Sequence, residues 1–136
     1  MITPMGTAQK KTVAVIGLGY VGLPLAVRAV ERGYDVIGFD THAEKVEVLK
    51  KKKSPIEDQY LIDNIPKFPF EATTDASRLA DADIVLICVP TPVDEMYYPD
   101  LEPVISAATV SAEHLKKGAL VVLESTVNPG VSEEVI

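Results

Sequence analysis

The 136-residue sequence predicts an α/β fold built around a doubly wound parallel sheet. Short runs rich in Val and Ile alternate with longer segments of helical pattern, which favours right-handed strand–helix–strand units. One run, Asp83–Val89 (DIVLICV), is continuously apolar, as expected for a strand buried on both faces of a parallel sheet. A glycine-rich turn also joins the first strand-like run to the first helical segment, as in sheets of this kind.

The first strand–helix–strand unit has clear boundaries. Lys11–Ile16 (KTVAVI) is a predicted strand because Val and Ile dominate it and a glycine follows. The predicted helix Val21–Arg32 carries Pro24 in its first turn, where the missing N–H costs little, and Gly33 is its stop signal. Tyr34–Phe39 (YDVIGF) is the second predicted strand.

The middle of the chain is less regular. His42–Lys52 has the pattern of a helix with a charged outer face. Ser54–Phe70 contains three prolines and is predicted to be irregular, with a short helix at Asp58–Asn64. Phe70–Thr73 is then a short third strand, and Asp75–Ala80 is a helical turn.

The last third of the chain returns to the alternating pattern. After the apolar strand comes a proline-rich loop, Pro90–Pro99, and then a predicted helix over Leu101–Leu115. Ala119–Leu123 (ALVVL) is predicted to be another buried strand, and Val131–Ile136 begins a further helix.

Composition excludes several classes of function. With 13 Lys+Arg against 20 Asp+Glu the net charge is −7, which argues against a protein that binds nucleic-acid backbones. A single cysteine excludes an intrachain disulfide or a cysteine-built zinc site and is compatible with a cytoplasmic protein. No apolar run is long enough to cross a membrane, and no signal peptide is visible. We expect residues 1–10 to form a flexible tail and residues 11–136 to form the folded domain.

The glycine-rich turn is the first functional signal. Residues 17–22 read Gly-Leu-Gly-Tyr-Val-Gly, a G-x-G-x-x-G pattern placed between a strand and a helix. Gly17 allows a tight turn, Gly19 allows the backbone to approach a pyrophosphate, and Gly22 allows close packing of the helix. The helix N-terminus then offers N–H groups to phosphate. A turn that binds no ligand is the alternative.

An acid at the end of the second strand completes the dinucleotide pattern. Asp40 follows Gly22 by 18 residues. Its carboxylate is placed to accept hydrogen bonds from the adenosine ribose and to repel a 2′-phosphate, so the sequence predicts a Rossmann-type domain that binds NAD rather than NADP. The alternative is that Asp40 caps the next helix.

Four motifs in order resemble the UDP-glucose/GDP-mannose dehydrogenase family. They are GLGYVGLPLA around the glycine turn, CVPTP at Cys88–Pro92, PDL at Pro99–Leu101 and ESTVNPG at Glu124–Gly130. CVPTPVDE followed by PDL is more similar to the branch acting on UDP-N-acetylmannosamine or UDP-N-acetylglucosamine. In its last motif the sequence has Val131 where the family usually has threonine.

The resemblance implies an NAD-dependent oxidation of the C6 hydroxyl of a UDP-sugar to a uronate for surface polysaccharides, in two hydride transfers by way of a thioester on a cysteine. The family's nucleophilic cysteine and catalytic lysine match nothing in residues 1–136. We therefore expect an NAD-binding domain truncated after about five strands, inactive by itself, with the UDP-sugar bound mostly by a missing domain. The full-length protein is expected to be a homodimer or larger, with no nucleic-acid or membrane partner.

Site residues carry over from the family motifs one at a time. Thr126 is expected to hold water near the thioester, which makes it the catalytic candidate, since a hydroxyl both donates and accepts. The resemblance assigns cofactor contacts to the glycine turn, to the end of the second strand and to the loops after the fourth and fifth strands: Gly17, Gly19, Tyr20, Val21, Gly22, Asp40, Lys45, Val89, Pro90, Thr91, Ser125 and Thr126.

Each of the less specific assignments has a structural alternative. Lys45 is otherwise an ordinary exposed helix lysine, Thr91 a turn residue, and Thr126 a backbone-capping threonine. Cys88 lies in an apolar run that would raise its pKa, so we expect a buried structural cysteine rather than a nucleophile. His42 and His114 are expected at the surface, with no metal site.

Two other classes of protein remain open at this point. One is a different Rossmann dehydrogenase of the 3-hydroxyacid type, which lacks the Ser-Thr-Val-x-Pro-Gly segment. The other is a non-enzymatic domain that senses a nucleotide.

Overall fold

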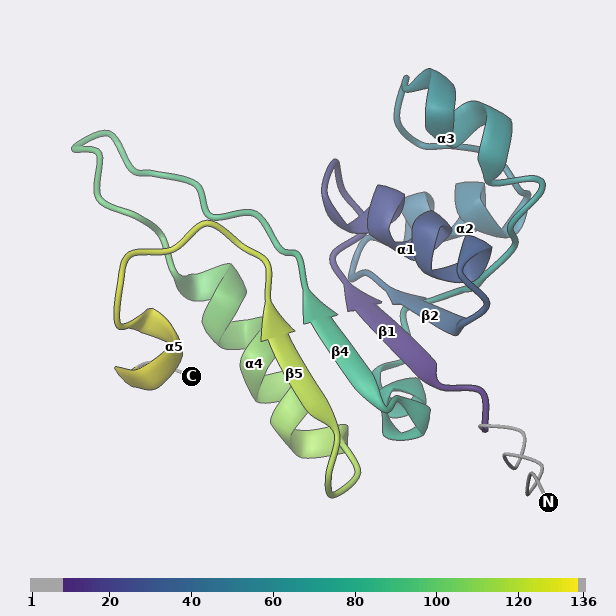
Figure 1. Cartoon of the computed structure of the whole chain (residues 1–136). Helices are drawn as coiled ribbons and strands as arrows, with labels where there is room; N and C mark the ends of the chain where they lie inside the picture. The colour runs from purple at the N-terminus through teal and green to yellow at the C-terminus, as the bar shows by residue number, and fades with distance from the viewer. Residues whose placement is uncertain (1–8, 135–136) are drawn as a thin grey trace, which may run out of the picture.

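The computed structural model describes residues 9–134, and five parallel strands form its single sheet (Figure 1). The spatial order is β3-β2-β1-β4-β5, so the chain crosses from one side of β1 to the other when it reaches β4. This confirms the predicted doubly wound parallel sheet. The strands are β1 (Thr12–Ile16), β2 (Asp35–Phe39), β3 (Glu71–Thr73), β4 (Ile84–Ile87) and β5 (Leu120–Leu123).

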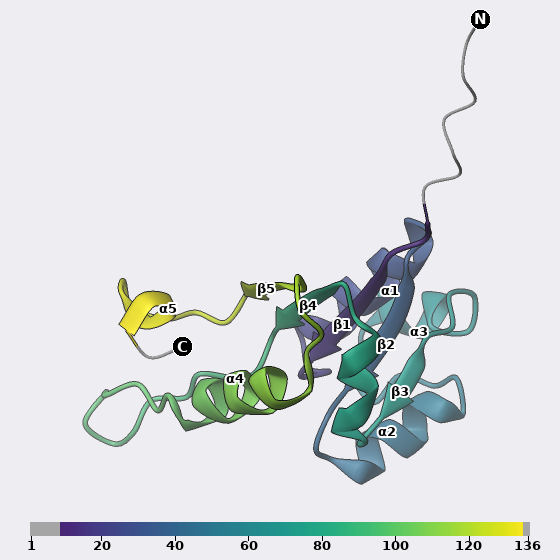
Figure 2. The ribbon, with the colours of Figure 1, turned by 90° about the horizontal axis from the view of Figure 1, so that it is seen from below.

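Helices cover both faces of the sheet, and Figure 2 shows α1 and α4 on opposite sides of it. One core cluster joins α1 (Gly22–Glu31) with apolar side chains of α2 (Ala43–Lys50) and α3 (Gln59–Asn64). The other cluster contains buried side chains of the short 3₁₀ helix η1 (Ala76–Asp81) and of α4 (Glu102–His114). These elements lie within one or two residues of their predicted boundaries.

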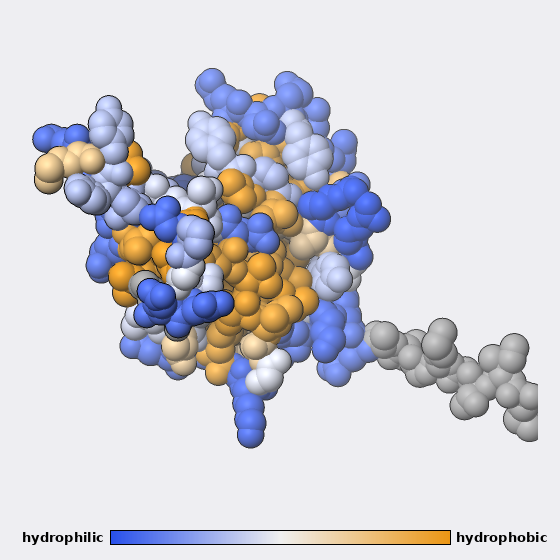
Figure 3. Space-filling model, turned by 60° about the vertical axis from the view of Figure 1, so that its left-hand side comes forward, coloured by the Kyte–Doolittle hydropathy of each residue, from blue (hydrophilic) through white to orange (hydrophobic). Residues whose placement is uncertain are grey.

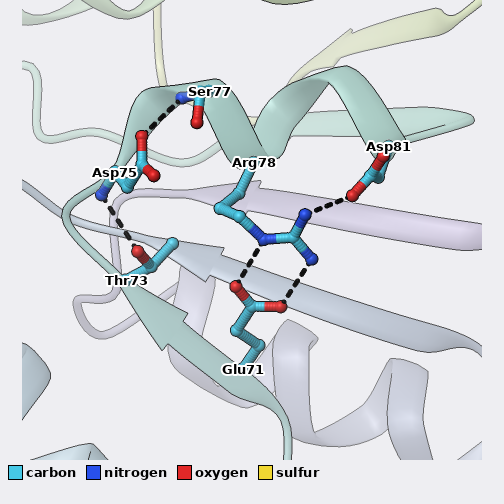
Figure 4. A network of polar contacts seen from close by, with 6 residues as sticks. All are labelled: Glu71, Thr73, Asp75, Ser77, Arg78 and Asp81. Carbon is cyan, nitrogen blue, oxygen red and sulfur yellow. Dashed lines mark hydrogen bonds and ion pairs between the residues drawn. The ribbon is translucent and has the colours of Figure 1, made fainter.

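Polar contacts fasten η1 to β3 (Figure 4). Arg78 of η1 donates from Nε and from its second terminal nitrogen to the two carboxylate oxygens of Glu71, at 2.7 and 2.9 Å, and it also pairs with Asp81. Asp75 caps the start of η1 by accepting from the Ser77 N–H at 2.9 Å. Asp75 is therefore the cap of the predicted helical turn rather than its first helical residue.

Strand β5 is more exposed than the sequence predicted. Leu120 and Val121 are 58% and 40% exposed, so the expectation of a second fully buried strand is wrong. The reason is that β4 is its one hydrogen-bonded neighbour within residues 9–134, which makes β5 an edge strand. Figure 3 shows a broad apolar area on this side of the molecule.

Strand β4 also departs from the prediction, because only one of its faces is fully covered. Val85 and Ile87 point into the cluster beneath α4 and are fully buried. Ile84 and Leu86, on the face that carries α1, are half-buried. Burial on both faces therefore holds at β1 and weakens toward β5.

The described residues stop short of both ends of the chain. Helix α5 (Val131–Glu134) confirms the start of the predicted last helix, whose residues 135 and 136 lie outside the described part. The expected flexible tail at residues 1–10 lies outside it up to residue 8. Among residues 9–134, no helix combines the length and apolar character needed to cross a membrane.

Candidate dinucleotide-binding site

A cavity of about 780 Å³ lies where the carboxyl ends of the parallel strands meet. Parallel α/β sheets bind their ligands at this edge, beside the point where the strand order reverses. All the predicted cofactor contacts except Gly22 line the cavity: Gly17, Gly19, Tyr20, Val21, Asp40, Lys45, Val89, Pro90, Thr91, Ser125 and Thr126. The fold thus brings to one place the glycine turn, the end of the second strand and the loops after the fourth and fifth strands, whereas the PDL motif at Pro99–Leu101 does not line the cavity.

Two glycines of the turn are required by close contacts within the protein. Gly17 has a φ of +91°, and a Cβ added there would lie 2.8 Å from the Cys88 carbonyl oxygen. A Cβ added at Gly22 would lie 1.8 Å from the carbonyl oxygen of Gly17 and 3.1 Å from Cβ of Cys88. Gly22 therefore allows α1 to start against the turn itself and the end of β4, which explains why it is covered rather than exposed to the cavity.

Gly19 differs, because its surroundings are open. A Cβ added at Gly19 would meet no atom within 4 Å, and the residue lines the cavity. Helix α1 begins beside it with no side-chain cap at Val21, and the first helical bond runs from the Leu23 N–H to the Gly19 carbonyl oxygen at 3.0 Å. Uncapped N–H groups at a helix start favour an anionic ligand, so this opening fits a pyrophosphate.

Asp40 is the main polar group at the end of the cavity formed by β2 and α2. Its side chain is only 6% exposed, and four nitrogen atoms surround its carboxylate. Oδ2 accepts from the Leu18 N–H at 2.9 Å and from Lys45 Nζ at 2.8 Å. Oδ1 accepts from the His42 N–H at 2.9 Å and lies 2.9 Å from His42 Nδ1.

These contacts determine the charge state of Asp40. Burial by itself raises the pKa of the carboxyl, but the hydrogen bonds from Lys45, His42 and Leu18 outweigh it and lower the pKa from 3.8 to about 2. The carboxylate is thus ionised and held toward the cavity. Helix α2 starts at Ala43, and its N-cap residue is His42 with no side-chain cap, so the alternative role of Asp40 as the cap of this helix is wrong.

Lys45 is not an ordinary exposed lysine. Its side chain is 27% exposed, lines the cavity and pairs from the first turn of α2 with Asp40 at the end of β2. His42 also lines the cavity from the other side of the carboxylate, and its side chain is 76% exposed, which agrees with its predicted surface position. Sequence analysis did not include His42 in the site, although it stands two residues after the acid.

The loops after β4 and β5 form the far end of the cavity. Ser125 donates from Oγ to the Val89 carbonyl oxygen at 2.7 Å, which ties the two loops together. Thr91 is half-buried and Thr126 exposed, and both line the cavity. The Thr126 hydroxyl makes no hydrogen bond within residues 9–134, so it is available to a ligand rather than used as a backbone cap.

The sequence did not predict the wall of the cavity that α4 contributes. Pro103, Ser106, Ala107 and Val110 line the cavity at spacings of three and four residues, which is one face of a helix. Small side chains on this face leave the cavity open. The signal was present in the helical pattern, but only the packing of α4 shows that this face borders the cavity. Further lining residues are Ile16, Phe39, Thr41, Pro55, Ile56 and Glu124.

Cys88 is buried, as expected, beneath the glycine turn. Burial, and secondarily the charge of Glu124, raise the pKa of its thiol from 9.0 to about 11, which leaves it protonated near neutral pH. His114 is half-buried rather than at the surface, and its Nδ1 lies 2.9 Å from the Val110 carbonyl oxygen. Residues 9–134 contain no cluster of three metal-ligating His, Cys, Asp or Glu side chains.

A parallel sheet in this strand order, an open glycine turn at a helix start and an acid at the end of β2 together define a Rossmann-type NAD-binding domain. The family model described as "UDP-glucose/GDP-mannose dehydrogenase family, NAD binding domain" matches residues 11–136. The chain belongs to this family, so the predicted resemblance is confirmed.

Two curated relatives carry names from the UDP-N-acetylhexosamine branch of the family. The chain is 40% identical to a UDP-N-acetyl-D-glucosamine 6-dehydrogenase of Pseudomonas aeruginosa, over 90% of this chain and 29% of the relative. It is 41% identical to a UDP-N-acetyl-D-mannosamine dehydrogenase of Salmonella typhimurium, over 90% of this chain and 30% of the relative. The chain thus spans about 30% of the length of these relatives.

Solved structures agree with this assignment. A UDP-D-ManNAc dehydrogenase from Pyrococcus horikoshii superposes with a TM-score of 0.87 at 32% identity, covering 91% of this chain and 30% of that one. A GDP-mannose dehydrogenase from Pseudomonas aeruginosa superposes with a TM-score of 0.85 at 30% identity, covering 90% and 30%. An arogenate dehydrogenase from Synechocystis is similar in fold alone, with a TM-score of 0.62 at 24% identity.

Proposed function

We propose that this chain supplies the cofactor-binding part of an NAD-dependent nucleotide-sugar 6-dehydrogenase. The proposed reaction oxidises the C6 hydroxyl of a UDP-sugar, of the UDP-N-acetylhexosamine class, to a uronate in two hydride transfers. The observation that carries the proposal is the cavity that runs from Asp40 past the open Gly19 turn to Thr126. Names of relatives such as UDP-N-acetyl-D-glucosamine 6-dehydrogenase support the substrate class.

Different residues hold different parts of NAD. When bound, NAD accepts the hydride. Gly19 leaves room for the pyrophosphate next to the uncapped N–H groups of α1. Asp40, held in place by Lys45, accepts hydrogen bonds from the adenosine ribose. The side chains of α4 cover the apolar side of the cavity. The main contribution of this domain is therefore to position the cofactor.

The loop after β5 is the part of the domain nearest to the proposed chemistry. Ser125 is anchored to the β4 loop, while the free hydroxyl of Thr126 faces the cavity. We assign Thr126 the role of holding a water molecule, since its hydroxyl both donates and accepts. The division into a tail at residues 1–10 and a cofactor domain at residues 11–136 belongs to the same proposal.

The partners, cellular location and assembly of the whole protein are part of the same proposal. A substrate that is a small nucleotide sugar requires neither nucleic acid nor a membrane, and the free thiol of Cys88 is compatible with the reducing cytoplasm. The exposed apolar side of β5 supports assembly into a homodimer or larger oligomer. Light scattering on the full-length protein measures its mass and tests the assembly.

Calorimetric titration of the chain with NAD tests the proposal. Wild-type chain should bind, and Gly19→Ala should weaken binding about ten-fold or more, because the added methyl occupies the space beside the uncapped N–H groups. Stability should hardly change, because an added Cβ at this position meets no atom within 4 Å. Ala112→Val, at an exposed position of α4 outside the cavity, is the control for added bulk. A wild-type chain that fails to bind NAD would contradict the proposal.

A further inference from the structure

Glu124 occupies a defined position at the far end of the cavity. Its backbone N–H donates to the Ile87 carbonyl oxygen at 2.9 Å, so it is the first residue beyond β5 and still follows the line of the sheet. Since Ile87 and Leu123 are register partners, Glu124 lies beside Cys88, one step further along the two strands. Alternation along a strand then places both side chains on the same face of the sheet.

That face is the one on which α1 begins. Cys88 packs in the cluster beneath α1, and its Cβ lies 3.1 Å from the position of an added Cβ at Gly22. Glu124 lines the cavity and is exposed, and its carboxylate makes no ion pair or hydrogen bond within residues 9–134. The negative charge of Glu124 also raises the pKa of the Cys88 thiol, although burial is the larger cause. An uncompensated negative charge therefore stands at this end of the site.

The other carboxylate of the cavity is in a different state. The charge of Asp40 is neutralised by Lys45 at 2.8 Å, with His42 beside it. In a dinucleotide site of this topology the two mononucleotide halves lie on opposite sides of the switch point. Asp40 at the end of β2 marks the adenosine half, so the ends of β4 and β5 mark the nicotinamide half.

We propose that Glu124 makes this domain prefer NAD⁺ over NADH. The oxidised nicotinamide ring carries a positive charge and the reduced ring carries none, so a nearby carboxylate stabilises only the oxidised form. For two charges near the surface we expect a contribution of about three- to five-fold to the affinity ratio. The inference rests on the proposed function, because it requires that NAD occupies this cavity. Such a preference favours release of NADH after each hydride transfer.

The test measures the dissociation constants of NAD⁺ and NADH separately for the full 136-residue chain, at low ionic strength. Glu124→Gln should weaken binding of NAD⁺ about three- to five-fold and leave NADH almost unchanged. Glu124→Asp keeps the charge and should restore most of the preference. Glu113→Gln, the same change at an exposed position of α4 outside the cavity, should alter neither constant. Rising salt should reduce the wild-type preference.

The outcomes separate the two proposals. Equal weakening of NAD⁺ and NADH by Glu124→Gln, or no change in either, would overturn the role of Glu124 while leaving NAD binding intact. A wild-type chain that binds neither nucleotide would overturn the proposed function and this inference together. A melting curve of each variant shows whether the changed affinity reflects the site rather than the fold.

Discussion

The half of this domain around β1 and β2 is more fully buried than the half around β4 and β5. Around β1 and β2 every strand residue except those at the first position is buried, and Asp40 at the end of β2 has a donor for each carboxylate oxygen. Around β4 and β5, six of the eight apolar strand residues remain partly or largely exposed. Glu124 at the end of β5 has no partner within residues 9–134.

The difference teaches which parts of a cofactor site are preformed. In the adenosine half, the carboxylate of Asp40 already has its hydrogen-bond donors before any ligand arrives, so ligand binding costs little reorganisation there. In the nicotinamide half the hydroxyl of Thr126 and the carboxylate of Glu124 remain available. We therefore expect substitution of Asp40 to alter stability and substitution of Glu124 to alter ligand preference.

The largest expected effect on stability is at Gly22, in the half around β1 and β2, which we call the closed half. Gly22→Ala places a Cβ 1.8 Å from the Gly17 carbonyl oxygen, a backbone atom with no freedom to move away. Overpacking of this kind should lower the free energy of unfolding by about 3 kcal/mol. Urea denaturation measures the change, with Gly19→Ala as the control because its surroundings are open. Equal stability of the two variants would show that the turn is not tightly packed.

The next effect is a loss of stability of the closed half at low pH. The pKa of Asp40 falls from 3.8 to about 2 on folding, so the folded chain binds fewer protons and stability must fall as pH drops through this window. The loss should total about 2 kcal/mol between pH 4 and 2.

Asp40→Asn tests this assignment. The variant should be less stable than wild type by about 2 kcal/mol at pH 7 and should lack the corresponding part of the acid dependence. Asp63→Asn, at an exposed position of α3, is the matched control and should behave as wild type. Thermal unfolding followed by circular dichroism across the pH range measures both. An unaltered acid dependence in Asp40→Asn would assign it to other carboxylates.

The smallest effect compares one pair of residues within the half around β4 and β5. Val85 and Val121 are register partners on β4 and β5, but Val85 is fully buried and Val121 is 40% exposed. Val85→Ala should cost about 2 kcal/mol of unfolding free energy, and Val121→Ala about 0.5 kcal/mol. Urea denaturation of both variants measures the ratio. Similar costs would mean that β5 is as well packed in solution as β4.

Much of the site was predictable because dinucleotide binding depends on local signals. The glycine pattern, the strand before it and Asp40 at the end of the next strand each follow from a few neighbouring residues. The lining by α4 and the partnership of Asp40 with Lys45 were harder to predict, since they depend on how a helix face is turned. Glu124 stands in the ESTVNPG motif and His42 stands two residues after Asp40, but no sequence pattern indicated a role for either side chain.

The parallel α/β fold, the NAD-binding turn and the family could all be predicted from the amino-acid sequence, because periodicity, glycine spacing and motif order are properties of the chain alone. Tertiary structure decided which apolar strands are buried and which polar groups are satisfied. Ala119–Leu123 has the composition of a core strand, yet Leu120 lies at an edge of the sheet, 58% exposed. The physical reason is that burial and charge compensation depend on neighbours distant in sequence, which no local pattern specifies.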